Sequence, residues 1–220
     1  MQIAIVVYDR LTALDAIGPY EVLSRLPGVE LVFVGAATGE QRTDTGRLGL
    51  IADQTLAAVP APDVVLVPGG PGQTALMDDA ELLAWLRAAD ATSTWTTSVC
   101  TGSLLLAAAG LLDGRRATSH WLAIDELARL GATPVRERVV EDGKYLTAAG
   151  VSAGIDMALT LAGRIAGEEV AQQIQLGIEY DPQPPFSAGS PRTAPPQAVE
   201  TLRARSRFAT AGDDTTAQRP

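Results

Sequence analysis

The sequence predicts an α/β protein built on a doubly wound, mostly parallel β-sheet. Ile3 to Tyr8 and Leu31 to Ala36 are short, continuous apolar runs, which are typical of strands buried on both faces of a parallel sheet. Between them, LDAIGPYEVLSRLPG has apolar residues at helical spacing and ends at Gly28, which completes a β-α-β unit. The alternation recurs along the chain, and it favours a functional site at the carboxyl ends of the strands.

The later elements follow from the same patterns. We expect strands at residues 64–67 and 94–99, and helices at 78–89, 101–109, 119–130, 152–165 and 168–180. VVEDGKYLTAAG, residues 139–150, has an Asp-Gly turn between two β-prone runs and predicts a hairpin. The sequence shows no internal repeat.

The composition changes at Asp181, where DPQPPFSAGSPRTAPP begins. This stretch is too rich in proline for a helix or a central strand, so we expect it to run over the surface. QAVETLRARSRF beyond it predicts one short helix, and the last dozen residues are expected to be disordered. The chain is therefore interpreted as one α/β domain over residues 1–186 with a C-terminal extension over residues 187–220.

Charge and hydropathy argue against several classes of partner. With 17 basic and 26 acidic residues the formal net charge is −9, which gives no attraction for nucleic acid or anionic membranes. The longest apolar stretch, Leu104 to Leu112, is well short of the roughly 20 residues that span a bilayer. MQIAIVVYDR lacks the features of a signal peptide, and a single cysteine cannot form an internal disulfide. We expect a cytoplasmic protein whose partner is a small molecule or another protein.

The single cysteine, Cys100, lies where a predicted strand meets a predicted helix, in TWTTSVCTGSLLLAAAGLL. The small residues of VCTGS suit a sharp turn, and its hydroxyls suit the first helical N–H groups. A thiol at a helix N-terminus feels the positive end of the helix dipole, so we expect its thiolate to be favoured near neutral pH. A buried cysteine that acts as a small hydrophobe explains the position equally well.

Two further stretches follow strands of the same sheet. In VPGGPG, residues 67–72, adjacent glycines let backbone N–H groups turn toward a ligand, as an oxyanion hole requires, although a plain turn is the simpler interpretation. The stretch lacks the Lys-Ser/Thr ending of a phosphate loop. Asp15, after the first strand, would ordinarily cap the following helix. Because these loops open on one sheet edge, we expect Asp15, the glycines and Cys100 to converge.

Together, LDAIGPYEVL, VPGGPG, VCTGSLLLAAAGLLDGRRATSHW and GIEYDPQPPF resemble the PfpI-like branch of the class I glutamine amidotransferase superfamily, and within it the isonitrile hydratases, over about residues 1–186. The resemblance implies a flavodoxin-like fold, a homodimer and catalysis without a metal or other cofactor. It also implies a cysteine nucleophile with an acidic residue beside the sulfur, and Cys100 and Asp15 match these positions. Gly70 and Thr101 match the residues whose backbone amides face the developing charge.

The sequence departs from other branches of that superfamily at the residue after the nucleophile. Thr101 stands where peptidase members carry histidine, so we do not expect a Cys-His-acid triad. His120, the only histidine, is interpreted as a partly buried residue near a helix start, and one histidine cannot build a metal site. The large aromatic residues expected in the core or the wall of a pocket are Trp85, Trp95, Trp121, Tyr8 and Tyr20.

The implied reaction is the hydration of an isonitrile, R–N≡C, to an N-substituted formamide through a thioimidate on Cys100. The reaction needs a soft nucleophile and a nearby acid, and Asp15 would supply the proton, with Thr101 adding a hydroxyl. Thr101, His120 and Asp181 are the next candidates for the acid, and the residues that bind the substrate are not predicted.

Other functions compete with this interpretation. One is the sensor domain of an AraC-type regulator, although the roughly 34 residues after Phe186 are too few for two DNA-reading motifs. A redox sensor or a glyoxalase-like protein would use the same thiol, and a dimeric scaffold would need no chemistry at all.

Overall fold

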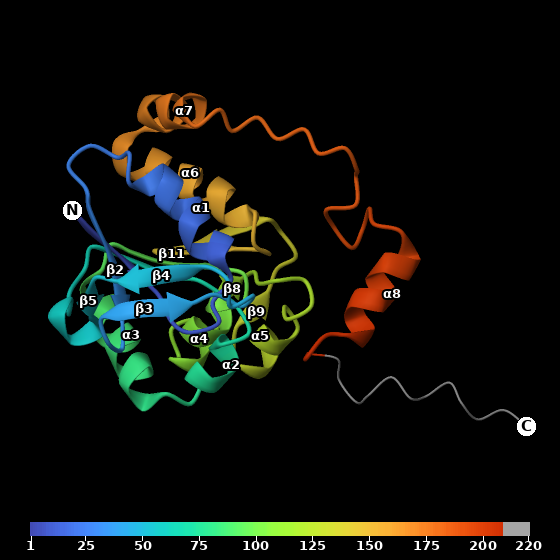
Figure 1. The fold of residues 1–220 in the computed structure, drawn as a ribbon, viewed down its shortest axis with the longest axis horizontal. Coiled ribbons are helices and arrows are strands. Elements are labelled where there is room, and N and C mark those ends of the chain that lie inside the picture. Colours follow the sequence, from blue (N-terminus) through green and yellow to red (C-terminus); the bar gives the residue numbers. More distant parts are fainter. Residues whose placement is uncertain (209–220) are drawn as a thin grey trace, which may run out of the picture.

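A computed structural model, which describes residues 1–208, contains a mostly parallel sheet between two layers of helices (Figure 1). The seven strands have the order β10-β11-β7-β6-β1-β2-β5, and only β10 runs antiparallel to its neighbour. Their bounds are β1 Gln2–Val6, β2 Glu30–Gly35, β5 Gln54–Thr55, β6 Val64–Val67, β7 Trp95–Val99, β10 Val139–Asp142 and β11 Tyr145–Ala148. The predicted flavodoxin-like α/β fold is confirmed.

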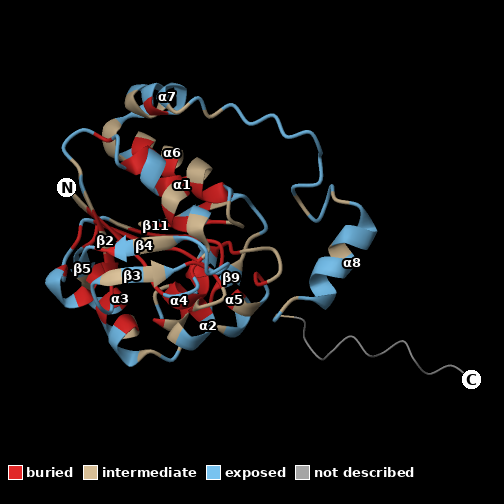
Figure 2. Ribbon diagram, viewed as in Figure 1, coloured by how far each residue is buried: buried red, intermediate tan, exposed pale blue. Residues whose placement is uncertain are grey.

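The helices cover both faces of this sheet (Figure 1). On one face lie α1 (Ala13–Leu23), α6 (Ala153–Ala166) and α7 (Glu168–Gly177); on the other lie α2 (Gln73–Leu76), α3 (Ala80–Thr92), α4 (Gly102–Ala108) and α5 (Glu126–Arg129). The central strands are buried on both sides, as the continuous apolar runs indicate (Figure 2). A short 3₁₀ helix spans Leu56–Ala58.

The predicted helix over residues 119–130 is wrong for most of its length, because residues 119–120 have no regular structure, residues 121–125 form turns and only α5 is helical. Tertiary hydrogen bonds explain the difference. The Ser119 hydroxyl donates to the Cys100 carbonyl at 3.0 Å, and the Thr118 N–H donates to the Thr147 hydroxyl at 2.9 Å. These contacts tie the segment to the ends of the sheet, so local helical spacing does not decide its conformation.

Two small pairs of strands were not predicted. β3 (Gly39–Arg42) and β4 (Gly49–Ala52) form a separate antiparallel hairpin, and β8 (Arg116–Ala117) pairs in parallel with β9 (Thr133–Pro134). The predicted hairpin over residues 139–150 is confirmed as β10 and β11.

The C-terminal extension leaves α7 and turns back toward the body of the molecule (Figure 1). Residues 181–195 run over the surface without a helix or strand, as predicted, whereas residues 178–180, predicted to be helical, lie beyond the end of α7. The predicted short helix is α8 (Pro196–Ala204). The tail expected to be disordered, residues 209–220, lies outside the described residues. Within the described part of the chain, no helix is both long and apolar enough to cross a bilayer.

A close approach between β6 and α4 places the turn that carries Cys100. Gly102 opens α4 so near the carboxyl end of β6 that an added Cβ would collide with the backbone carbonyl oxygens of Val67 and Pro68. Glycine is therefore required at this position, because the contact is with backbone that cannot move aside.

We expect Gly102→Ala to lower the free energy of unfolding by about 1–3 kcal/mol, the usual cost of overpacking a core. Gly163→Ala is the matched control, because Gly163 lies inside α6 and its added Cβ would meet only the Ala171 Cβ at 3.8 Å. The control should be neutral or stabilising by up to about 1 kcal/mol. Urea denaturation of both variants measures the difference, and equal stabilities would contradict the steric argument.

Candidate functional site

Cys100 lies on a strained turn between β7 and α4. Its φ of 58° is in the left-handed region, which is unusual for a residue other than glycine. The surrounding chain holds it there: its N–H donates to the carbonyls of Ala148 and Ala149, and the hydroxyls of Ser103 and Ser119 donate to its own carbonyl. The predicted elbow is present, and the side chain is only 5% exposed.

Asp15 is fully buried in the first turn of α1. Its Oδ2 accepts a hydrogen bond from the Gly69 N–H at 2.9 Å, and its Oδ1 has no hydrogen-bond partner among residues 1–208. Thr12 is the N-terminal cap residue of α1, and Asp15 makes no capping hydrogen bond there. The interpretation of Asp15 as a helix cap is therefore wrong, and its carboxyl faces the end of the sheet.

The glycine loop, residues 67–72, is hydrogen-bonded both to α1 and to the elbow. Gly69 donates to Asp15, and the next N–H, that of Gly70, donates to the Thr101 hydroxyl oxygen at 3.0 Å. A Cβ on Gly70 would lie 2.5 Å from the Thr12 nitrogen, and its φ is 139°, so only glycine fits. The resemblance implied that the Gly70 N–H faces the reacting atoms. In the structure this N–H instead donates its hydrogen bond to the Thr101 hydroxyl.

Two backbone N–H groups lie at the Cys100 sulfur instead. Those of Val151 and Thr101 act on the sulfur and lower the pKa of the thiol. Thr101 was predicted in this role, whereas Val151 was missed. Val151 follows β11, and it reaches the elbow only because β11 pairs with β7. No local motif reveals that pairing.

Burial controls the protonation of Asp15 and Cys100. It raises the pKa of Asp15 to about 7, against the opposing effect of the Gly69 N–H and the Cys100 thiol. Burial, followed by the negative charge of Asp15, also raises the pKa of Cys100, although the Val151 and Thr101 N–H groups oppose the change. The expected thiolate, stabilised by a helix dipole, is therefore wrong for the resting site. Near neutral pH the thiol therefore holds its proton while Asp15 titrates, and the charge of Asp15 is coupled to the ionisation of Cys100.

Tyr8 and Arg207 complete the surroundings of this pair. The Tyr8 hydroxyl donates to the Pro68 carbonyl at 2.8 Å; burial, then the charges of Asp15 and Cys100, raise the pKa of Tyr8. Arg207 arrives from the C-terminal extension and donates from Nη2 to the Gly70 carbonyl and the Gln73 Oε1, both at 3.0 Å. Tyr8 was predicted in the core or a pocket wall, and it is buried, whereas no sequence pattern indicated Arg207.

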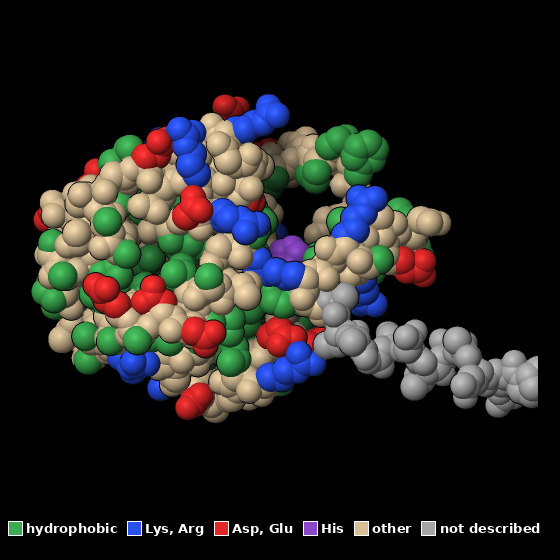
Figure 3. All heavy atoms as spheres, turned by 60° about the horizontal axis from the view of Figure 1, so that its bottom comes forward, with side chains coloured by type: hydrophobic (Ala, Val, Ile, Leu, Met, Phe, Trp, Pro, Cys, Tyr) green, Lys and Arg blue, Asp and Glu red, His purple; other side chains and the backbone are tan. Residues whose placement is uncertain are grey.

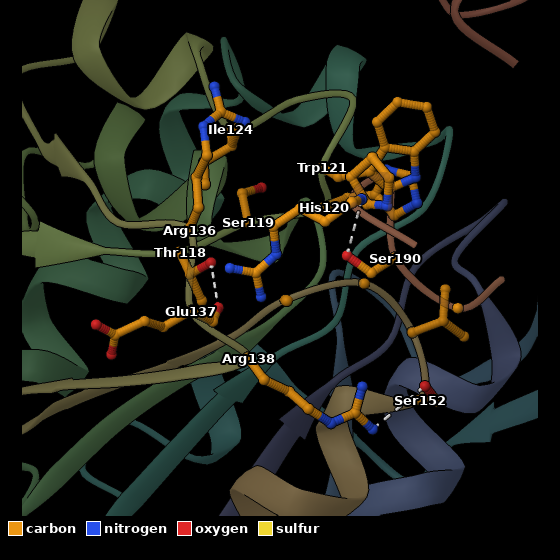
Figure 4. A pocket seen from close by; sticks show the side chains of 16 residues that line it. Thr118, Ser119, His120, Trp121, Ile124, Arg136, Glu137, Arg138, Ser152 and Ser190 are labelled. Atoms are coloured by element: carbon orange, nitrogen blue, oxygen red, sulfur yellow. Dashed lines mark hydrogen bonds between the residues drawn. The ribbon is translucent and has the colours of Figure 1, made fainter. Parts of the chain in front are cut away.

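A cavity of about 430 Å³ lies beside the elbow (Figure 4). Its walls are residues 118–121, 136–138 and 149–152 of the body together with residues 189–192 of the extension. His120 lines it, and the histidine side chain, purple in Figure 3, lies in the hollow between body and extension. Burial and then the charge of Arg207 lower the pKa of His120.

The other predicted residues have different surroundings. Trp85 is buried and donates to the Val59 carbonyl, Trp95 packs against the core and Trp121 lines the cavity, whereas Tyr20 is 36% exposed and stacks on Phe33. Asp181 is exposed, and its carboxylate accepts a hydrogen bond from the Gln183 side chain. No cluster of three or more His, Cys, Asp or Glu residues that could hold a metal ion occurs in the described range.

Comparisons with known proteins agree with this geometry. The sequence profile of the DJ-1/PfpI family matches residues 1–164. Isonitrile hydratase of Pseudomonas putida is 46% identical over 205 residues, which cover 93% of this chain and 90% of that protein. The HTH-type transcriptional regulator CdhR of Pseudomonas aeruginosa is 42% identical over 95 residues, which cover 42% of this chain and 28% of the regulator. The crystal structure of a ThiJ/PfpI family protein from Pseudomonas syringae superimposes with a TM-score of 0.89 at 40% identity, covering 93% of this chain and 86% of the other.

The raised pKa of Asp15 predicts a specific dependence of stability on pH. In the unfolded chain the carboxyl ionises near 3.8, and in the folded chain near 7. At low pH both states hold the proton, whereas above about pH 7 the folded state carries a buried charge, so stability falls as the pH rises through this interval. Asp15→Asn removes the titration. Relative to the parent, it should gain about 3 kcal/mol between pH 5 and pH 8, measured by urea denaturation. A constant difference across this range would show that the Asp15 pKa is not raised.

Proposed function

The chain belongs to the DJ-1/PfpI family, and from that premise we propose that it hydrates isonitriles to N-substituted formamides. One observation carries the proposal: a buried carboxyl with a pKa near 7 lies beside the cysteine of a strained elbow. The similarity to the Pseudomonas putida isonitrile hydratase extends over nearly the whole chain and supports the same reaction.

The first step forms the thioimidate. The Cys100 sulfur attacks the terminal carbon of R–N≡C, and the proton shared by Cys100 and Asp15 is delivered to that carbon, which gives R–N=CH–S–Cys. The unpartnered Oδ1 of Asp15 is available to carry this proton. A carboxyl with a pKa near 7 can both give and accept a proton at neutral pH, as general acid–base catalysis requires.

The second step consumes water and restores the enzyme. Water adds to the thioimidate carbon, one of its protons goes to nitrogen, and the C–S bond breaks to release R–NH–CHO. The second proton returns to the Asp15–Cys100 pair. The N–H groups of Val151 and Thr101 stabilise the sulfur as it leaves with negative charge. Thr101 accepts from Gly70 through its hydroxyl oxygen, so its own hydroxyl hydrogen can orient the water.

The homodimer, the cytoplasmic location, the division at residue 186 and the absence of a cofactor remain predictions. The alternatives are weaker on physical grounds. Redox sensing requires an accessible thiol of low pKa, whereas Cys100 is 5% exposed and burial raises its pKa. The regulator CdhR shares only 28% of its length with this chain.

Incubation with a simple alkyl or aryl isonitrile should yield the corresponding formamide, detected by mass spectrometry. Cys100→Ala should abolish turnover, and Cys100→Ser should be nearly inactive because an alcohol lacks the readily formed anion of a thiol. Adding a chelator should change nothing. Turnover by Cys100→Ala above a few per cent of the parent, or activity lost to the chelator and restored by zinc, would contradict the mechanism.

Asp15→Asn should lower turnover by about 10²-fold or more, because an amide cannot deliver the proton to carbon. Asp79→Asn is the matched control, since Asp79 is a true helix cap that accepts from the N–H groups of Glu81 and Leu82, and asparagine caps about as well. The control should keep parental turnover. In the parent, kcat/KM should decline as the pH rises above about 7, where Asp15 loses its proton. Near-parental turnover of Asp15→Asn would exclude this residue as the acid.

A further inference from the structure

The C-terminal extension returns to the body and ends beside the glycine loop. Arg207 donates from one guanidinium nitrogen to both the Gly70 carbonyl and the Gln73 Oε1, across 137 and 134 residues of sequence. Phe208 packs against the hydrophobic core, and the Arg203 guanidinium lies 5.9 Å from the centre of the Trp121 ring. The end of the extension is thus attached to the glycine loop, to the core and to Trp121 in the wall of the cavity that residues 189–192 help to enclose.

The loop residue that Arg207 holds, Gly70, is linked to the reacting pair through neighbouring residues. Gly70, whose carbonyl accepts from Arg207, donates its N–H to Thr101, the neighbour of Cys100. The preceding residue, Gly69, donates to Asp15. Hydrogen bonds, together with the peptide links between Gly69 and Gly70 and between Cys100 and Thr101, therefore connect the extension to both members of the catalytic pair.

The second residue held by Arg207, Gln73, has a buried amide group that is only partly hydrogen-bonded. Its side chain is fully buried at the start of α2, yet its Nε2 has no hydrogen-bond partner in the described part of the chain. A guanidinium only donates hydrogen bonds, so the contact with Arg207 requires the amide oxygen to face the arginine. The amide nitrogen is then a buried donor without an acceptor, which is a feature that a bound ligand would satisfy.

Electrostatic interactions also link Arg207 to the active site. Burial lowers the pKa of Arg207, while Tyr8 and Cys100 in their ionised forms raise it. The attraction is mutual, so the guanidinium favours negative charge on the Cys100 sulfur. The charged and titratable groups that act on this cluster are Asp15, Tyr8, Cys100, Arg207, Asp44, Arg10 and His120.

We propose that Arg207 is a positioning residue of the active site, which fixes the glycine loop and Gln73 and supplies a positive charge that acts on Cys100. The C-terminal extension is then a working part of the site. The inference about turnover rests on the proposed function, whereas the inference about the thiol rests on the site alone.

The test uses the full chain with Arg207→Gln, which removes the charge, and Arg207→Lys, which keeps it. Arg205→Gln is the control, because it removes the same charge from a position two residues away. The Arg205 side chain makes no hydrogen bond or ion pair within residues 1–208. Iodoacetamide is the probe, and since Cys100 is the only cysteine, intact mass reports its alkylation alone. The rate of alkylation is measured against pH, with isonitrile turnover and thermal melting beside it.

Arg207→Gln should raise the apparent pKa of alkylation by about half a unit or more, and it should lower turnover about tenfold through misplacement of the loop. Arg207→Lys should restore the alkylation pKa but only part of the turnover, and Arg205→Gln should match the parent. An unchanged alkylation profile in Arg207→Gln, or an equal shift in Arg205→Gln, overturns the proposal. If the parent itself does not hydrate isonitriles, the proposed function fails while the alkylation profiles still decide the role of Arg207.

Discussion

The left-handed backbone of Cys100 is the constraint on which the rest of the site depends. An L-residue adopts this conformation only where its surroundings determine it fully, and here β11 and the Ser103 and Ser119 hydroxyls do so. Any other backbone at this position would carry the sulfur away from Asp15 and from the N–H groups that face it. The parallel pairing of β7 with β11 is therefore as much a catalytic feature as a structural one.

The low exposure of the site has two opposing effects. Burial raises the pKa values of both Asp15 and Cys100, which makes the thiolate scarce in the resting protein. The same dry surroundings strengthen each hydrogen bond to a developing charge, because little water competes with the backbone donors. The arrangement suits a reaction in which the nucleophile and the proton act together on one neutral substrate carbon.

The sheet, the elbow and the convergence of three loops could be predicted because they depend on local patterns: continuous apolar strands, small residues at the turn and adjacent glycines. What could not be predicted depends on pairings between distant segments. Residues 119–125 lose their predicted helix to hydrogen bonds with the sheet, the Gly70 amide is taken by Thr101, and the Val151 amide arrives through strand pairing. Arg207 had no signal at all, since an arginine in a polar tail is ordinary sequence.

Two different parts of the chain form the walls of the cavity beside the elbow. Its inner wall includes buried residues of the body such as Ser119 and Ile124, where a substitution disturbs the packed core. Residues 189–192 belong instead to a segment at the surface without a helix or strand. Substitutions in that outer wall alter the shape and polarity of the chamber at little cost to folding. Changes in the C-terminal extension alone can therefore alter the choice of substrate between related proteins. The residues that form and break the carbon–sulfur bond need not change.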